Sequence, residues 1–278
     1  MYQKVALNGL DVAYAEAGSG ARPLVLVHGF TGSKLDFMPR LAELAALGRV
    51  LVPDLRGHGD STNPGDARGY SLEQGASDLL GFLAKLDIKE CDLLGHSMGG
   101  MIALRAVLAD SARIQSLVLM DTSARAPEGV RRETLDAGAQ VANAVGMSRF
   151  AEILREHAPG DESRTEADQR LQLEMGDAYW EAWRYPNYRS MDPVAFGAFG
   201  AAMFEQTPLL DRLAEIVCPT LVLVGTGDTG FLGASEELAR GISGARVARI
   251  PNAGHQPQLE NPDAWLDAIR NHLALVRT

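Results

Sequence analysis

Short apolar runs recur along this 278-residue chain, and segments with helical periodicity separate them. Runs this short and this uniformly apolar are typical of strands buried on both faces of a sheet. They cover residues 23–27, 50–52, 91–94, 116–120, 220–224 and 245–250. Strands that alternate with helices form a mostly parallel α/β sheet, and ligands of such sheets bind at the carboxyl ends of the strands. The alternation therefore predicts that the functional residues lie in loops that follow strands.

Local signals predict a hairpin and the first residues of two helices. The dipeptide at 8–9, Asn-Gly, stands between two segments of strand-forming residues, which is a strong signal for a tight hairpin. Ser71 and Gln74 have the spacing of a capping box, so a helix should begin at the residue after the serine. Asp192 and Pro193 predict an N-cap followed by a proline in the first helical position.

Residues 123–207 interrupt the alternation and are expected to be helical throughout. We therefore divide the chain into an α/β core, residues 1–122 and 208–278, and an inserted helical cap, residues 123–207. Aromatic residues are frequent in this insertion, among them Tyr179, Trp180, Trp183, Tyr185 and Tyr188. They could form a small core of the insertion alone, or they could also line a substrate pocket, because apolar pockets often form where two domains meet. The sequence leaves both interpretations open.

Charge and composition narrow the partners and the location of the chain. A formal net charge of −10 disfavours nucleic acid or an anionic membrane surface as a partner. No run of 18 apolar residues occurs, and the first residues lack the apolar core of a signal peptide. The two cysteines, Cys91 and Cys218, each stand beside a predicted strand and are expected to be buried thiols, not a disulfide. These observations predict a cytoplasmic protein.

Two glycine-framed motifs indicate different chemistries. The first, GTGDTG at 225–230, follows an apolar run and matches the G-x-G-x-x-G turn of dinucleotide-binding proteins. That interpretation requires an acidic residue at the end of the next strand, where this chain has Pro251 and Asn252. A helix opened by these glycines is not expected either, because residues 231–233 stand before the helix-forming run that begins at Ala234. A dinucleotide-dependent oxidoreductase is therefore a remote alternative.

The second motif, GHSMGG at 95–100, predicts a serine nucleophile. It follows a strand and precedes a helix, which is the context in which G-x-S-x-G forms a sharp turn with the serine at its tip. Gly95, Gly99 and Gly100 would let this turn pack without side-chain collisions, and the helix N-terminus would favour developing negative charge. A serine that only caps a helix needs no glycines on both sides, so we assign Ser97 as the nucleophile.

The base and the acid that would activate Ser97 are predicted from their places after later strands. A serine hydroxyl becomes a strong nucleophile only when a base takes its proton, and an acid must orient that base. Asp228 follows the predicted strand that ends near residue 224, and His255 follows the next strand. The order Ser, Asp, His along the chain is the one expected for this architecture. Asp121, which ends another predicted strand, is the alternative acid.

Several blocks of residues fall at the strand ends of the predicted sheet. They are Val27-His28-Gly29-Phe30, Pro53-Asp54-Leu55-Arg56-Gly57-His58-Gly59, the turn around Ser97, Pro219-Thr220-Leu221-Val222 before Asp228, and Gly254-His255. Together they resemble the α/β-hydrolase superfamily, in particular its small capped serine esterase and lactonase branch. The resemblance implies an α/β-hydrolase fold, with a mostly parallel eight-stranded sheet flanked by helices and an inserted helical cap. It also implies an oxyanion hole made by the backbone N–H groups of Phe30 and Met98.

The predicted activity is hydrolysis of carboxylic esters or lactones of small to medium apolar substrates, through an acyl-enzyme on Ser97. Such a small molecule is the only partner predicted; no metal or organic cofactor is needed, and no zinc-ligand spacing occurs. A carbon–carbon bond hydrolase of ring-cleavage products would use the same residues. Those relatives often have an aromatic residue after the catalytic histidine, where this chain has Gln256. A non-catalytic ligand receptor is a further alternative.

Other polar residues are assigned structural roles, and the conformation of one loop is not predicted. His58 is expected to shape a loop, and Asp54 and Arg56 are expected to form a buried pair. The side chain of His96 should face away from the nucleophile, and the histidine at position 272 should lie at the surface. The loop after the predicted acid lacks the proline of the family pattern, so the sequence does not decide whether Phe231 enters the pocket.

Overall fold

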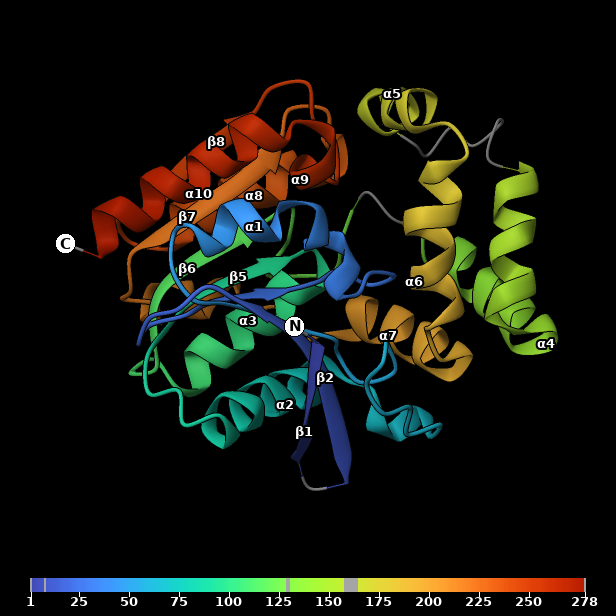
Figure 1. The fold of residues 1–278 in the computed structure, drawn as a ribbon, viewed down its shortest axis with the longest axis horizontal. Helices are drawn as coiled ribbons and strands as arrows, with labels where there is room; N and C mark the ends of the chain where they lie inside the picture. Colours follow the sequence, from blue (N-terminus) through green and yellow to red (C-terminus); the bar gives the residue numbers. More distant parts are fainter. Residues whose placement is uncertain (1, 8, 129–130, 158–164, 278) are drawn as a thin grey trace.

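The computed structural model describes residues 2–7, 9–128, 131–157 and 165–277, and strands among them form one sheet (Figure 1). The strands are β1 (Tyr2–Leu7), β2 (Leu10–Ala17), β3 (Leu24–Val27), β4 (Val50–Pro53), β5 (Cys91–His96), β6 (Ile114–Met120), β7 (Thr220–Gly225) and β8 (Arg246–Ile250). Their order across the sheet is β1-β2-β4-β3-β5-β6-β7-β8. β2 pairs antiparallel with β1 and β4, and all other neighbours are parallel. The predicted mostly parallel, eight-stranded sheet is confirmed.

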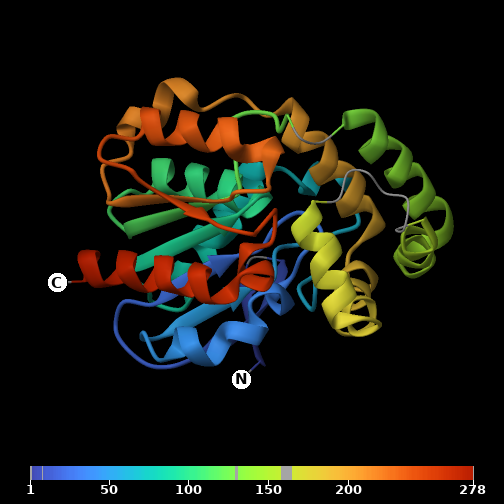
Figure 2. The same ribbon diagram turned by 90° about the horizontal axis from the view of Figure 1, so that it is seen from above.

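Helices cover both faces of this sheet. They are α1 (Leu41–Ala45), α2 (Leu72–Lys85), α3 (Met98–Ala109), α8 (Thr229–Gly241), α9 (Pro257–Glu260) and α10 (Pro262–Val276), with short 3₁₀ segments η1 (Lys34–Asp36), η2 (Met38–Arg40), η3 (Ala67–Gly69) and η6 (Leu210–Glu215). Val25 and Val27 of β3 pack with α2 and α3, whereas Leu24 and Leu26 pack with α1 and α10. Figure 2 shows these layers, with α3 and α8 on one side of the sheet and α1 and α10 on the other. Because both faces are covered, the central strands are uniformly apolar.

The local predictions agree with the structure. β1 and β2 form the predicted antiparallel hairpin, although Asn8 of its turn lies outside the described residues. At the start of α2 the side chain of Ser71 accepts a hydrogen bond from the N–H of Gln74 at 3.0 Å. The side chain of Asp192 caps the next predicted helix in the same way, by accepting from the N–H of Val194 at 3.0 Å.

A group of helices is inserted between β6 and β7 and lies beside the sheet, at the right of Figure 1. These inserted helices are α4 (Arg132–His157), α5 (Glu166–Met175), the π-helical segment η5 (Tyr179–Arg184), α6 (Tyr185–Arg189) and α7 (Pro193–Glu205). The prediction of helix throughout is too broad, because 123–128 and 206–207 are loop. Gly146, with a φ of +80°, divides α4 into two helical pieces, and glycine adopts this left-handed conformation without strain.

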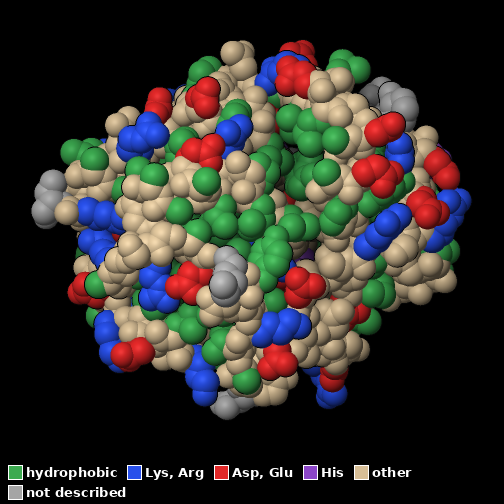
Figure 3. Space-filling view, viewed as in Figure 1, with side chains coloured by type: hydrophobic (Ala, Val, Ile, Leu, Met, Phe, Trp, Pro, Cys, Tyr) green, Lys and Arg blue, Asp and Glu red, His purple; other side chains and the backbone are tan. Residues whose placement is uncertain are grey.

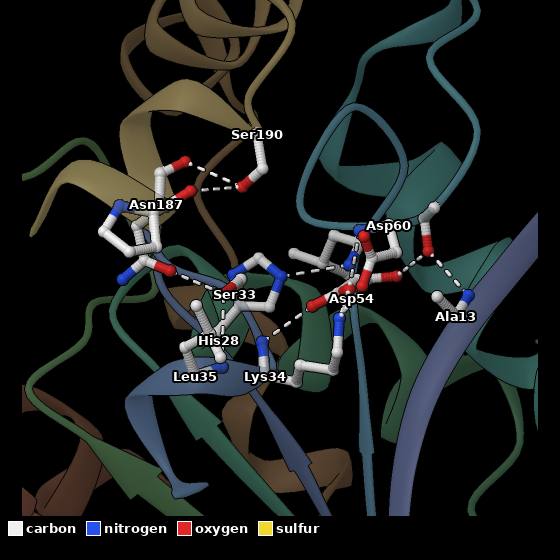
Figure 4. A network of polar contacts seen from close by, with 12 residues as sticks. Ala13, His28, Ser33, Lys34, Leu35, Asp54, Asp60, Asn187 and Ser190 are labelled. Carbon is white, nitrogen blue, oxygen red and sulfur yellow. Dashed lines mark hydrogen bonds and ion pairs between the residues drawn. The ribbon is translucent and has the colours of Figure 1, made fainter. Parts of the chain in front are cut away.

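The predicted pairing of Asp54 with Arg56 is wrong. Asp54 accepts hydrogen bonds from the backbone N–H and the ammonium group of Lys34, at 2.7 and 2.5 Å, and from the N–H of Asp60 (Figure 4). Arg56 instead pairs with the carboxylate of Asp78 on α2. The sequence places the first two residues side by side, but the loop after β4 directs them to partners on different elements.

Two further single-residue predictions have opposite outcomes. Both cysteines are free thiols, as predicted; Cys91 is buried as expected, but Cys218 is only half-buried. His272 is not a surface residue: it is buried on α10, and its Nδ1 accepts a hydrogen bond from the guanidinium of Arg246 on β8 at 2.7 Å. Within the described ranges, no helix combines the length and apolar character that a membrane crossing requires.

Candidate active site

Ser97 occupies a strained turn between β5 and α3. Its backbone has a φ of +54° and a ψ of −120°, which costs a non-glycine residue energy and persists only where the surroundings hold it. A Cβ atom added at Gly99 would lie 2.4 Å from the carbonyl oxygen of Val27, and one added at Gly95 would lie 2.4 Å from the carbonyl oxygen of Gly99. The glycines therefore permit the close backbone contacts that hold the serine in this conformation.

We expect Gly99→Ala to destabilise the fold by about 1–3 kcal/mol, because the added methyl group must push the backbone of β3 away. The melting temperature should fall by roughly 2–4 °C for each kcal/mol, measured by thermal unfolding followed by circular dichroism. Gly233→Ala is the matched control, because it lies in α8 with nothing within 4 Å of the added atom. The control should keep or raise the melting temperature. Equal melting temperatures for the two variants would contradict the proposed clash.

Two hydrogen bonds join Ser97, His255 and Asp228. The Oγ of Ser97 lies 3.0 Å from Nε2 of His255, and Nδ1 of the same ring lies 2.7 Å from Oδ2 of Asp228. A neutral ring that donates from Nδ1 to the carboxylate leaves Nε2 free to accept the serine proton. The three residues follow β5, β8 and β7, whose carboxyl ends share one edge of the sheet, so residues far apart in the sequence meet there.

Electrostatics couple the histidine to the aspartate. Burial acts to lower the pKa of His255, but the charge of Asp228 and its hydrogen bond outweigh burial and hold this pKa above its ordinary value. Burial acts to raise the pKa of Asp228, and the interaction with His255 overcomes it, so the pKa of this carboxyl is lowered. The pair therefore favours an imidazolium beside a carboxylate, which is the state that follows proton uptake by the ring.

Two side chains that the sequence analysis did not place in the site hold the loop of His255. Glu260 of α9 accepts hydrogen bonds from the backbone N–H groups of Gly254 and Gln256, on either side of the histidine. His96 donates from Nε2 to the carbonyl oxygen of His255 at 2.7 Å. The expectation that His96 faces away from the nucleophile is wrong, because its ring lies 5.0 Å from the ring of His255, which contacts Ser97. Glu260 lies four and six residues along the chain from the N–H groups that it holds, whereas His96 is 159 residues away from His255, so no spacing rule reveals the contact of His96.

The helix that follows Asp228 begins earlier than predicted. α8 begins at Thr229, directly after the aspartate, so residues 231–233 are helical and the later start expected at Ala234 is wrong. This start places the ring of Phe231 in the cavity, 4.9 Å from the ring of His255, which answers the question that the sequence left open.

The G-x-G-x-x-G stretch has a structural explanation in these loops. A Cβ atom added at Gly225 would lie 2.1 Å from the carbonyl oxygen of Gly254, and one at Gly227 would lie 3.2 Å from that of Ala253. The glycines thus let the loop of the aspartate approach the loop of the histidine closely. β8 ends at Ile250 without an acidic residue, so the ribose partner of a dinucleotide is missing from the described strand end.

Asp121, the alternative acid, lies behind Asp228. Its side chain is fully buried, one oxygen accepts the N–H of Gly225 at 3.0 Å, and a carboxyl oxygen lies within 4.8 Å of one of Asp228. The contact with the ring of His255 belongs to Asp228. Among the described residues, these two aspartates and His255 are the one group whose possible metal ligand atoms lie within 4.8 Å of one another, but both ring nitrogens already have hydrogen-bond partners.

The two predicted oxyanion-hole residues lie in backbone segments that border Ser97. A Cβ atom added at Gly29 would be 3.2 Å from the Cβ of Ser97, so the loop after β3 lies against the nucleophile. Phe30 is the next residue, and its carbonyl oxygen accepts a hydrogen bond from Nε2 of His58 at 2.6 Å. Met98 is the first residue of α3, where N–H groups have no acceptor within the helix. His58 thus shapes this loop, as expected.

A cavity of about 800 Å³ lies where the inserted helices meet the sheet, and it borders Ser97, Asp228 and His255. Figure 3 shows hydrophobic side chains gathered around a hollow in this part of the surface. The inserted helices contribute mainly apolar and aromatic side chains: Phe150, Leu154, Tyr179, Trp180, Trp183, Tyr188, Phe196 and Met203. Several of these aromatic residues also form a small core of the insertion, so they pack within the insertion and line the cavity as well.

Asp36 of η1 links the inserted helices to the sheet part of the molecule. Its carboxylate accepts hydrogen bonds from the indole N–H of Trp183 at 2.9 Å and from the amide of Asn187 at 2.8 Å. Ser33 donates a further hydrogen bond to Asn187 (Figure 4). Burial raises the pKa of Asp36 to about 6. No motif or spacing in the sequence predicts these contacts.

The comparison with known proteins assigns the family. The sequence model described as "alpha/beta hydrolase fold" matches residues 22–262, and the chain therefore belongs to the α/β-hydrolase family. The superfamily resemblance drawn from the sequence blocks is confirmed.

Several individual proteins resemble this chain over nearly its whole length. A malate-bound thermophilic esterase from Thermogutta terrifontis is 32% identical, with 100% of each chain covered and a TM-score of 0.83. The enol-lactonase from Burkholderia xenovorans LB400 is 26% identical, with 98% of this chain and 100% of the other covered and a TM-score of 0.83. The 3-hydroxybutyrate-oligomer hydrolase of Cupriavidus necator is 30% identical, over 90% of this chain and 89% of its own.

Proposed function

We propose that this protein is a serine hydrolase that cleaves carboxylic esters or lactones. In this proposal Ser97 is the nucleophile, His255 the general base and Asp228 the acid that orients the base. The observation that carries it is the hydrogen-bonded chain from Ser97 through His255 to Asp228 at the edge of a largely apolar cavity. The similarity to an esterase and an enol-lactonase supports it. We further propose that residues 123–207 are a cap over this site.

The proposed reaction proceeds in two halves. Ser97 attacks the carbonyl carbon while Nε2 of His255 takes its proton, and the N–H groups of Phe30 and Met98 stabilise the oxyanion. His255 then gives the proton to the leaving alcohol, which departs from the acyl-enzyme. Water attacks the acyl-enzyme with the same ring as base, and Ser97 is restored. Asp228 keeps the ring in the required tautomer and stabilises its charged form.

The cavity indicates the substrate class. Its volume lies in the range of small-molecule sites, and its aromatic lining favours apolar groups over charged ones. We therefore propose aliphatic esters of short to medium chain length, or aryl esters, as substrates. With 4-nitrophenyl esters from acetate to decanoate, kcat/KM should peak at short to medium chains and decline toward decanoate. A strong preference for decanoate or for charged esters would contradict this assignment of the pocket.

The ester series, combined with a covalent probe of the serine, also tests the alternative of carbon–carbon bond hydrolysis. A fluorophosphonate probe that labels wild type at Ser97 shows an activated serine independently of any substrate. If the probe labels the serine while all esters and several lactones remain intact, the ester and lactone proposal fails and carbon–carbon hydrolysis becomes the leading assignment. If neither the probe nor any ester reacts, the proposed nucleophile itself is wrong.

We expect kcat/KM to rise with pH as His255 loses its proton, because only the neutral ring can accept the proton of Ser97. Since the carboxylate of Asp228 holds the pKa of His255 above its ordinary value, the midpoint of this rise should lie above that of a free histidine side chain. Initial rates with 4-nitrophenyl butyrate over pH 5–9 measure it. A midpoint well below 6 would show that burial, not the aspartate, dominates the titration.

A further inference from the structure

The end of β6 brings a second buried carboxyl group against the acid of the proposed site. Met120, the last residue of β6, lies opposite Leu223 of β7 in the parallel register, so the next residue, Asp121, reaches the loop that leads to Asp228. The N–H of Asp121 donates to the carbonyl oxygen of Leu223 at 2.9 Å, and its backbone has a φ of +46°. A non-glycine residue in this conformation marks a position that the surrounding structure holds against strain.

The closeness of the two buried carboxyl groups favours a proton between them. One oxygen of Asp121 accepts the N–H of Gly225, and its buried Oδ2 has no N–H or O–H donor from any described residue. A carboxyl oxygen of Asp121 nevertheless lies within 4.8 Å of a carboxyl oxygen of Asp228. Carboxylate oxygens only accept hydrogen bonds, and two adjacent carboxyl groups in a buried site do not both ionise.

We propose that Asp121 is a positioning residue that stays protonated and donates its carboxyl proton to Asp228. Asp228 carries the negative charge of the pair because it also accepts the N–H of His255 at 2.7 Å, whereas Asp121 is fully buried with one backbone donor. The donated proton fixes one part of the Asp228 carboxylate, so that Oδ2 stays directed at the ring. The pair then presents one negative charge to His255, not two.

The charge state matters because the ring must act as a base. A second negative charge close to His255 would stabilise the imidazolium and shift its deprotonation to higher pH. The other charged or titratable groups that act on this ring are Glu260 on α9, Arg184 on η5 and His96 at the end of β5. Glu260 also acts on Asp121, and burial raises the pKa of Asp121 well above its ordinary value.

The first test uses the neutral isostere Asp121→Asn, whose amide can donate to Asp228 and accept from Gly225. This inference rests on the proposed site, and its kinetic arm reads the titration of His255 through kcat/KM against pH. If Asp121 is neutral, the midpoint of the asparagine variant should agree with wild type within about 0.3 pH unit. If Asp121 is ionised, removal of its charge should lower the midpoint by about one unit or more, which would overturn the proposal.

A second variant separates donation from packing. Asp121→Ala removes both hydrogen bonds, and its kcat should fall about tenfold or more, while Asp121→Asn stays within about threefold of wild type. Equal losses in the two variants would show that donation to Asp228 is not what Asp121 supplies.

The last test needs neither a folded variant nor a substrate, so it also separates this inference from the proposed function. Infrared spectra of wild type labelled with ¹³C-aspartate should show the C=O band of a protonated carboxyl group at pH 8. Among the described aspartates, Asp36 also has a pKa above its ordinary value; burial raises this pKa to about 6, so Asp36 is ionised at this pH. Absence of the band at pH 8 would overturn the proposal even if the esterase activity is established.

Discussion

Replacing Ser97 with alanine is expected to lower kcat for 4-nitrophenyl esters by roughly 10⁴-fold or more, because no acyl-enzyme can form. KM and the melting temperature should change little. The turn is held by backbone contacts of its glycines, and the side chain of Ser97 serves as no helix cap. Initial rates measured with excess enzyme are needed to separate the residual rate from spontaneous hydrolysis. The residual rate reports what binding and the oxyanion-hole amides contribute alone.

Ser235→Ala is the matched control for this substitution. Ser235 lies buried in α8, and its hydroxyl has no hydrogen-bond partner among the described residues, so its removal should leave kcat within about twofold of wild type. The fluorophosphonate probe should label this control and wild type equally, and it should not label Ser97→Ala. Retention of ester hydrolysis by Ser97→Ala would remove the serine from the mechanism.

Replacing Asp228 with asparagine is expected to lower kcat by roughly 10³- to 10⁴-fold. The shape of the side chain is kept, but the amide cannot stabilise the charged ring, and it can hold His255 in the wrong tautomer. The pKa of His255 should also fall, because the negative charge that raises it is lost. The pH profile of the residual activity therefore tests the same contact as kcat, and the melting temperature should be close to that of wild type.

The neighbouring Asp121 makes the outcome of Asp228→Asn informative in either direction. Activity close to wild type would mean that Asp121 takes the role of the acid, and the double variant Asp121→Asn/Asp228→Asn would then lose that activity. If the single and double variants are equally impaired, Asp228 is the acid of the wild-type protein. Glu237→Gln removes a carboxylate from α8, the helix that follows Asp228, and should leave kcat unchanged.

The supporting contacts indicate how the site keeps its shape. Glu260 holds the backbone N–H groups on either side of His255, and His96 holds the carbonyl group of His255 itself. His58 holds the carbonyl group of Phe30. None of these side chains needs to touch the reacting atoms. Fixed backbone geometry is what orients amide donors and a general base before the reaction begins, so these buried polar contacts are consistent with the proposed chemistry.

The sequence alone determined the layered α/β sheet and the residues that the structure brings together at its edge. Uniformly apolar runs report strands covered on both faces, and the carboxyl ends of parallel strands share one edge. Ser97, Asp228 and His255 could therefore be placed near one another without coordinates. Capping at Ser71 and Asp192 was equally predictable, because these signals depend only on residues three or fewer positions apart.

Only the tertiary structure decided which polar groups pair across the fold. The predicted pair of Asp54 with Arg56 was wrong, His272 was buried, and the contacts of Asp36 and His96 with distant segments had no sequence signal. Burial and hydrogen-bond partners depend on which loops approach in space, and a single residue carries no periodicity that reports it. The proximity of Asp121 to Asp228 is of the same kind, because strand order and register set it. The protonation that we propose for the carboxyl group of Asp121 depends on the burial of this group.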